Sequence, residues 1–130
     1  MFYGCTSLKY VQPVLSPPTI TSYGYSYMFA NCTSLEIPPE ISATRISGTF
    51  GCQYMFSGCS KLKYAPEIYI SNLSGGSHGM EHMFENCISL EKTPSILPAT
   101  TLVTYCYRNM FTGCKSITSG PKLPALTATT

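Results

Sequence analysis

The sequence predicts a β/α solenoid of about five repeated units, each with one short strand, one short helical turn and a return loop. A Met-Phe pair recurs with steps of 27, 27, 28 and 27 residues between the methionines. These methionines are Met1, Met28, Met55, Met83 and Met110. Regular periods of about 20–50 residues are typical of units that stack on one another. With 130 residues, the chain has the length of one domain. We therefore predict a single repeat domain over residues 1–130, with units starting near residues 1, 28, 55, 83 and 110, as a segment of a longer array.

Further columns keep register with the Met-Phe pair. A cysteine follows each Met after four residues, an aliphatic residue after seven and a second aliphatic residue after thirteen. A proline stands eleven residues after the Met in four of the five units, and in the first unit Gln12 occupies that column and Pro13 follows it. Five units that share this many columns cannot arise by chance.

Each part of the unit has a predicted conformation. The Met-Phe-x-x-Cys segment predicts one helical turn that brings Phe and Cys to the same side. One turn is too short to be stable alone, so it must pack against neighbouring units. The segment that ends in Pro-x-Ile predicts a strand, because proline disfavours helix and suits a strand end. Stacked strands would form a parallel sheet with rungs about 4.8 Å apart.

The aromatic and cysteine columns are the predicted core. They comprise Phe2, Phe29, Phe56, Phe84, Phe111, Cys5, Cys32, Cys59, Cys87 and Cys114. Buried free thiols are the favoured interpretation of the cysteine column, because Cys packs as a small apolar residue. The alternatives are a disulfide ladder or a metal ladder. Side chains in register have a poor geometry for disulfides, and zinc sites use closely spaced cysteine pairs.

The motif Met-Phe-x-x-Cys-x-Ser-Leu, followed by Pro and an aliphatic residue, resembles the BspA-type leucine-rich repeats over essentially the whole chain. Residues 105–117 resemble them most closely. The resemblance implies a leucine-rich-repeat-like, curved right-handed solenoid within a large surface protein of commensal or anaerobic bacteria. It also implies adhesion or ligand binding. The chain departs from the pattern in having fewer leucines and one extra residue in the return around residues 73–79.

Composition argues against catalysis and against several classes of partner. Asp is absent, which excludes Asp-based triads and EF-hands. A net charge of +2 argues against a nucleic-acid surface. No apolar run reaches the length of a membrane span. His78 and His82 depart from the His-Glu-x-x-His zinc motif, and His82 shares a column with Tyr27 and Tyr54, so a polar aromatic position is the simpler interpretation. We therefore expect no enzyme, no cofactor, no bound metal, no nucleic-acid partner and no membrane insertion.

The residues after the Leu column form the predicted strand face. Lys9, Glu36, Lys63 and Glu91 alternate in sign from unit to unit, so we expect opposite charges to lie side by side and stabilise the register. The next column varies, and variable columns are where a solenoid can present a ligand face. The predicted ligand-binding residues are Tyr10, Tyr64, Tyr69, Glu40, Glu67 and Lys92. The alternative is that these tyrosines only cover neighbouring units.

The predicted function is a non-catalytic binding module for recognition or adhesion at the cell surface. Its ligand would be a host protein, a matrix component or a glycan. We expect a cell-surface or secreted location as part of a longer protein, although no signal peptide is visible. The alternative is a structural repeat protein that assembles end to end or within a larger particle such as a phage, because neither end shows the polar capping segment that a solenoid needs.

Overall fold

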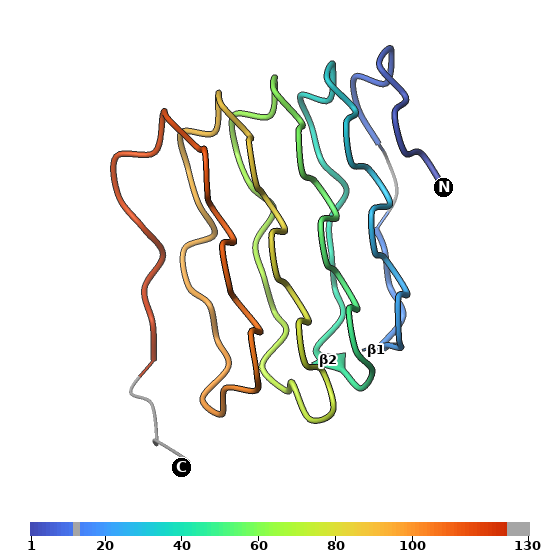
Figure 1. Ribbon diagram of the computed structural model, residues 1–130, viewed down its shortest axis with the longest axis vertical. Helices are drawn as coiled ribbons and strands as arrows, with labels where there is room; N and C mark the ends of the chain where they lie inside the picture. The colour runs from blue at the N-terminus through green and yellow to red at the C-terminus, as the bar shows by residue number, and fades with distance from the viewer. Residues whose placement is uncertain (12–13, 125–130) are drawn as a thin grey trace.

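The chain winds into a stack of similar coils, one for each sequence repeat (Figure 1). The computed structural model describes residues 1–11 and 14–124. Gln12 and Pro13, which belong to the proline column, and residues 125–130 lie outside the described residues. We number the coils by the methionine they contain: coil one (1–21), coil two (22–48), coil three (49–76), coil four (77–103) and coil five (104–124).

Strand structure is sparse. Strand β1 (Thr19–Ile20) pairs in parallel with β2 (Arg45–Ile46), Thr19 lying opposite Arg45 and Ile20 opposite Ile46. The remaining contacts of this kind among the described residues are isolated parallel bridges. They are Tyr10–Ile37, Leu15–Ile41, Arg45–Asn72, Tyr64–Lys92 and Ile96–Lys122. Prolines in most units remove backbone donors from this side of the coil, so a continuous ladder does not form.

The predicted β/α solenoid of the leucine-rich-repeat kind is wrong. Across residues 1–11 and 14–124 there is no helix, and β1 and β2 are the whole of the regular strand structure. The Met-Phe segments form consecutive turns instead of the predicted helical turns. We call them the turn ribbon, which consists of residues 22–31, 49–58, 77–86 and 104–113.

Two sets of hydrogen bonds alternate along the turn ribbon. In coil two, the amides of Tyr25, Tyr27 and Phe29 donate to carbonyls of coil three at 2.7–2.9 Å. The amides between them donate three residues back within their own coil, as Met28 does to Tyr25 at 3.1 Å. Each amide along this stretch therefore has a partner, half of them within the coil and half between coils. An α-helix would direct all of them within one segment, which would leave the coils without this ladder.

Residues with a left-handed backbone conformation recur at every fourth position in the turn ribbon. The second, sixth and tenth residue of each segment has a positive φ, and all of these except two glycines carry side chains. In coil two they are Tyr23, Tyr27 and Asn31, with φ of 54–59°. Non-glycine residues rarely adopt this conformation, and it persists where surrounding contacts determine it. An α-helix needs a negative φ at every residue, so a positive φ at every fourth residue prevents a helix from forming.

Glycine and asparagine alternate at the last left-handed position of each segment. From coil one to coil five this column contains Gly4, Asn31, Gly58, Asn86 and Gly113. A Cβ on Gly58 would meet the side-chain oxygen of Asn31, and a Cβ on Gly113 would meet that of Asn86. Glycine is therefore needed at these two positions both for its φ and for the close approach of the neighbouring side chain.

Phenylalanine rings form a continuous stack inside the coils. Neighbouring rings of the Phe2 to Phe111 column lie 5.4–5.6 Å apart, with planes within 9° of parallel. Phe29, Phe56 and Phe84 are fully buried, whereas Phe2 in coil one is 43 % exposed and Phe111 in coil five is partly buried. The aromatic stack therefore extends through the core of the molecule and reaches its surface at the terminal coils.

The cysteine column lies beside this stack. Each thiol from coil two onward donates to the carbonyl of the phenylalanine one coil earlier, at 2.9–3.2 Å between Sγ and O. Cys32, Cys59 and Cys87 are buried, Cys114 is partly buried and Cys5 is exposed, all as free thiols. A regular Sγ–H···O contact thus satisfies thiols that the sequence places in register.

Candidate binding face

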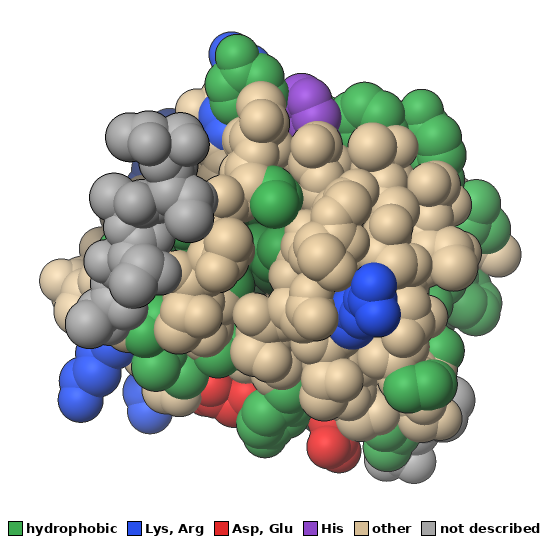
Figure 2. All heavy atoms as spheres, turned by 90° about the horizontal axis from the view of Figure 1, so that it is seen from below, with side chains coloured by type: hydrophobic (Ala, Val, Ile, Leu, Met, Phe, Trp, Pro, Cys, Tyr) green, Lys and Arg blue, Asp and Glu red, His purple; other side chains and the backbone are tan. Residues whose placement is uncertain are grey.

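Large apolar side chains are exposed in one column on the side of the coils opposite the turn ribbon. We call the column formed by Tyr10, Ile37, Tyr64 and Lys92 the variable stripe. Tyr10 is 63 % exposed, Ile37 61 % and Tyr64 52 %. In Figure 2 the visible acidic side chains lie at one edge and the histidine at the opposite edge. The exposed acidic residues belong to the side of the variable stripe, and both histidines belong to the turn ribbon.

Backbone pairing along the variable stripe occurs in alternate pairs of coils. Coils one and two are joined by the Tyr10–Ile37 bridge, and coils three and four by Tyr64–Lys92. Between these pairs, no backbone hydrogen bond among the described residues joins Glu36 or Ile37 to Lys63 or Tyr64. Among the described residues, the amides of Lys63 and Tyr64 and the carbonyl of Glu36 therefore have no partner in the backbone of a neighbouring coil.

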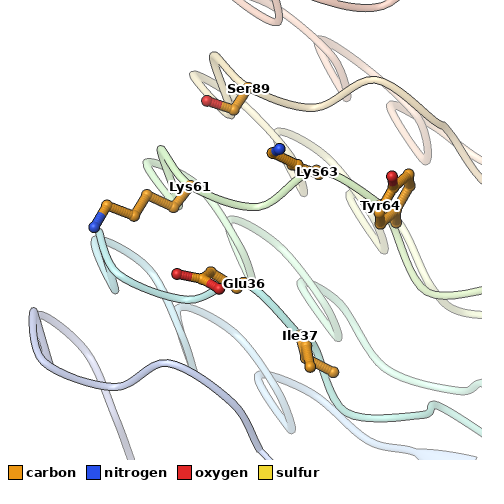
Figure 3. Close-up of a pocket in the computed structure, with 6 residues that line it drawn as sticks. All are labelled: Glu36, Ile37, Lys61, Lys63, Tyr64 and Ser89. Atoms are coloured by element: carbon orange, nitrogen blue, oxygen red, sulfur yellow. The ribbon is translucent and has the colours of Figure 1, made fainter.

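A groove of about 390 Å³ opens at this interruption. Figure 3 shows its lining side chains, which are Glu36, Ile37, Lys61, Lys63, Tyr64 and Ser89. They come from coils two, three and four. Ile37 and Tyr64 supply apolar walls, whereas two ammonium groups, one carboxylate and two hydroxyls supply polar contacts. The groove has the mixed character of a ligand site, in which a few polar groups orient a ligand against an apolar surface.

Tyr64 and Lys92 are the two predicted ligand contacts that the structure brings together. The Lys92 ammonium lies 5.9 Å from the centre of the Tyr64 ring, within range of a cation–π contact. Tyr10 lies two coils from Tyr64, with Ile37 between them in the stripe. The groove residues Glu36, Ile37, Lys61, Lys63 and Ser89 were not predicted as contacts. The membership of Ile37 in the column of Tyr10 and Tyr64 was the sequence signal for this site.

The other predicted contacts lie further along each coil. Tyr69 is 52 % exposed and Glu40 is exposed. Glu67 is exposed but engaged, because its Oε2 accepts hydrogen bonds from the backbone amide of Ser95 at 3.0 Å and from its hydroxyl at 2.7 Å. These bonds connect coil three to coil four where the proline column interrupts the backbone ladder. Glu67 therefore has a visible structural role.

The expected ion pairs between alternating charges are absent. Among the described residues, no ion pair within 4.0 Å involves Lys9, Glu36, Lys63 or Glu91. Their long side chains are exposed, and an exposed pair gains little over separate hydration. Glu36 and Lys63 instead line the groove.

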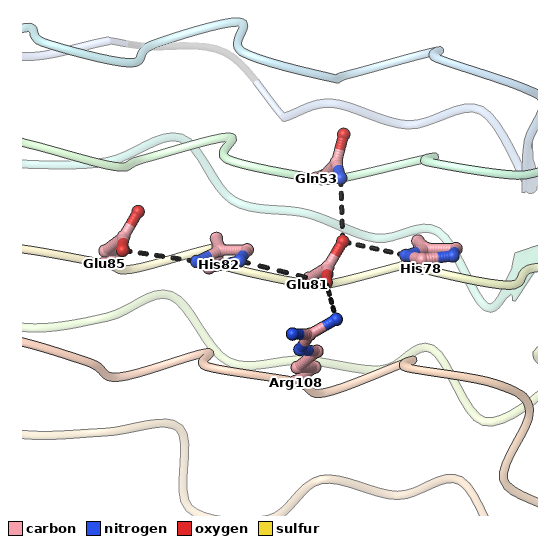
Figure 4. A network of polar contacts seen from close by, with 6 residues as sticks. All are labelled: Gln53, His78, Glu81, His82, Glu85 and Arg108. Carbon is pink, nitrogen blue, oxygen red and sulfur yellow. Dashed lines mark hydrogen bonds and ion pairs between the residues drawn. The ribbon is translucent and has the colours of Figure 1, made fainter.

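The ion pairs of the described chain gather around Glu81 on the turn ribbon (Figure 4). Glu81 Oε2 lies 2.8 Å from His78 Nδ1 and accepts a hydrogen bond of 2.8 Å from Gln53 Nε2. Glu81 Oε1 lies 3.8 Å from both His82 Nε2 and Arg108 Nη1. Burial acts to raise the pKa of the Glu81 carboxyl, but the His78 and Gln53 hydrogen bonds and the nearby imidazoles together lower it below its ordinary value. This cluster links coils three, four and five.

His82 and His78 pack into aromatic stacks on the same surface. The His82 ring lies parallel to Tyr54 at 4.5 Å between ring centres, and Tyr54 stacks on Tyr27 at 4.7 Å. His78 lies between Phe50 and Tyr105. In the described part of the chain, no group of three or more His, Cys or Glu side chains has the geometry to share a metal ion.

Comparison with known proteins adds no relative. No protein-family model, curated protein or solved structure matches this chain. Within residues 1–11 and 14–124, no helix is present that is long and apolar enough to span a bilayer.

Proposed function

We propose that this chain is a non-catalytic recognition module that binds its ligand on the variable stripe and at the adjoining groove. The observation that carries the proposal is the exposure of Tyr10, Ile37 and Tyr64 in one column, next to a groove with unpaired backbone groups. Contiguous exposed apolar surface with a polar rim is typical of interaction sites. Tyrosine suits such sites because it offers a large apolar ring and a hydroxyl.

The rest of the coil provides a scaffold for this face. The turn ribbon behind it connects every pair of neighbouring coils by backbone hydrogen bonds, and the phenylalanine stack fills the interior. Such a scaffold holds the exposed side chains in a repeated geometry, which reduces the ordering cost of binding. The groups that line the groove offer contacts to a ligand, and no nucleophile paired with a base is among them.

We further propose that the module acts in recognition or adhesion at a cell surface or in a secreted protein. The resemblance to BspA-type repeats supports this location, and it stays a prediction. A host protein, a matrix component or a glycan is the proposed partner class.

The test is binding of the purified chain to immobilised matrix proteins and to an array of glycans. We expect Tyr10→Ser combined with Tyr64→Ser to weaken binding at least tenfold, because aromatic residues dominate interface energies. Tyr23→Ser is the matched control, since Tyr23 is 59 % exposed but lies on the turn ribbon. Equal losses in both variants, or binding that survives the double substitution, would place the ligand elsewhere.

Self-association through the terminal coils is a second candidate, favoured by unpaired groups of the turn ribbon. In coil five, the amides of Tyr107, Asn109 and Phe111 have no backbone acceptor among the described residues. In coil two, the carbonyls of Gly24 and Ser26 have no donor among them. In the register of the ladder, Tyr107 and Asn109 of one copy match the Gly24 and Ser26 carbonyls of a second copy, whereas the Met28 carbonyl that would match Phe111 already accepts from Phe2.

Sedimentation velocity over a range of concentrations tests this candidate. If the chain self-associates, its sedimenting mass should grow with concentration. The Leu123→Glu variant should instead keep the mass of the monomer at every concentration. Leu123 is 59 % exposed and lines an apolar hollow with Phe111 in coil five. A monomer at every concentration would eliminate this candidate and leave the recognition proposal intact.

A further inference from the structure

We propose that the groove between coils two and three takes an acidic carbohydrate, with Lys61 and Lys63 each contacting a carboxylate of the ligand (Figure 3). This inference rests on the proposed recognition function and specifies its ligand class. It is carried by three properties of the residues that line the groove: their charge, the Tyr64 ring and the backbone groups that no neighbouring coil pairs.

The charge of the groove favours an anion. Lys61 and Lys63 both line it and both are exposed, whereas Glu36 is its single acidic residue. Lys92 adds a third ammonium one coil away, above the Tyr64 ring. No ion pair within 4.0 Å engages Lys61 or Lys63 in the described part of the chain. Each ammonium group is therefore free to form a charge-assisted hydrogen bond to a carboxylate of its own.

The walls and base favour a sugar over a simple anion. Tyr64 and Ile37 offer apolar surface to the carbon-bearing side of a sugar ring, and tyrosine combines such a surface with a hydroxyl. The unpaired amides of Lys63 and Tyr64 and the unpaired carbonyl of Glu36 can bond separate hydroxyls. Ser89 and Glu36 supply further acceptors. A ligand with many hydroxyls on a compact ring satisfies these scattered groups.

An acidic peptide fits the same charges less well. A bound strand pairs with a row of alternating donors and acceptors at an exposed sheet edge. Here the unpaired groups lie between two neighbouring coils within the stack. Further along the chain, Pro38, Pro39 and Pro66 have no backbone N–H, so the row of donors does not continue. The groove can therefore offer isolated hydrogen bonds and no extended ladder.

The experiment is isothermal titration of the full chain with three probes. They are an oligogalacturonate, the same oligosaccharide as its methyl ester, and an oligoglutamate of equal charge. We expect the oligogalacturonate to bind, more weakly as sodium chloride is raised, and to bind more tightly than both other probes. Lys61→Gln combined with Lys63→Gln should weaken it roughly tenfold, as expected for the loss of two exposed charge contacts.

Lys115→Gln combined with Lys122→Gln is the matched control, because it removes the same charge from exposed positions in coil five. The affinity of this control variant for the oligogalacturonate should stay within about twofold of the wild-type affinity, since surface charges remote from a bound ligand contribute little. All four lysines are exposed, so these substitutions leave the core unchanged. Equal losses in the two double variants would mean that net charge, and not the groove, determines binding, and would overturn the proposal.

The remaining outcomes separate this inference from the proposed function. Equal binding of the methyl ester would overturn the requirement for an anion, and equal binding of oligoglutamate would overturn the carbohydrate. Failure of both oligosaccharides would overturn the inference altogether. The proposed function fails only if the matrix and glycan surfaces also show no binding that depends on Tyr10 and Tyr64.

Discussion

At the scale of single residues, the fold depends on backbone conformations that most side chains avoid. The turn ribbon contains ten non-glycine residues with positive φ, and most of them are Tyr, His or Asn. Stacking of Tyr27 on Tyr54, and of Tyr54 on His82, holds several of them in place. The alternation of Asn31 and Gly58 shows how a neighbouring coil can decide which residue fits.

Gly58→Ala should destabilise the protein for two separable reasons. A left-handed Ala costs about 1–2 kcal/mol, and its Cβ would also meet Asn31 Oδ1. Gly4→Ala is the control for the cost of the left-handed backbone alone, since Gly4 has φ 68° and a Cβ there would meet no other atom. We expect Gly58→Ala to lose more unfolding free energy in urea than Gly4→Ala. Introducing Asn31→Gly alongside Gly58→Ala should remove the difference, and a persistent difference would contradict the contact.

Glu81 should make stability depend on acid pH. Its folded pKa lies below the ordinary value, so the folded state binds the proton less well than the unfolded chain. The stabilisation is therefore complete above the unfolded pKa of a carboxyl and is lost as pH falls through the folded pKa. Unfolding free energy measured in urea should decline over that acid range.

Glu81→Gln tests this dependence directly. At neutral pH the variant should lose about 1–3 kcal/mol, because hydrogen bonds to a buried charge are replaced by weaker ones. Its stability should then decline less steeply in acid than that of the wild type. Glu91→Gln serves as the control, because Glu91 is exposed. If Glu81→Gln and the wild type share one pH profile, the cluster does not govern acid stability.

At the scale of elements, the turn ribbon takes the place of both helix and sheet. Its segments of ten residues alternate bonds within a coil and between coils. Buried positions come in adjacent pairs at four-residue spacing, as with Met55 and Phe56 following Gly51 and Cys52. This four-residue period turns one face of the segment inward although no helix forms. Each ten-residue segment is stable only when the turn-ribbon segment of a neighbouring coil lies beside it.

Phe56→Ala and Phe2→Ala should differ sharply in cost. Phe56 is fully buried between two rings at 5.4–5.5 Å, so its removal should cost about 3–5 kcal/mol through lost burial and a cavity. Phe2 has one ring neighbour and is 43 % exposed. Its removal should cost much less. Chemical denaturation of both variants measures this, and equal losses would contradict a continuous core.

The sequence could predict many of the residues that lie inside, although Phe2 and Cys5 of the predicted core are exposed in coil one, but it could not predict the backbone that places them. The spacing of Phe29, Phe56 and Phe84 grouped side chains that the structure buries together. Helical turns were wrongly predicted, because the four-residue step from Met to Cys in Met-Phe-x-x-Cys fits the period of the turn ribbon as well as it fits a helix. The Gly/Asn column was the sequence signal for left-handed residues. The groove was not predicted, since the unpaired backbone between Ile37 and Tyr64 depends on how coils two and three pair.

At the scale of the whole molecule, burial is graded along the stack. Side chains in the middle coils have a neighbour on both sides, whereas the terminal coils have one. The burial of the cysteine column follows this gradient, from exposed Cys5 through buried Cys32, Cys59 and Cys87 to partly buried Cys114. Cys52 and Cys106 are buried as well. The thiols therefore report how well each coil is covered.

Alkylation of the native protein should follow that gradient. Burial raises the pKa of the Cys52 and Cys59 thiols to about 12, and raises that of Cys87 as well. Because the thiolate is the nucleophile, these groups are both uncharged and inaccessible at mildly alkaline pH. Iodoacetamide should modify Cys5 first, Cys114 more slowly, and the five buried thiols of Cys32, Cys52, Cys59, Cys87 and Cys106 only when the chain opens. Peptide mass spectrometry gives the order, and in urea all seven cysteines should react at similar rates. Labelling of Cys59 as fast as Cys5 in the native state would mean that the middle coils separate readily, which the ladder of the turn ribbon excludes.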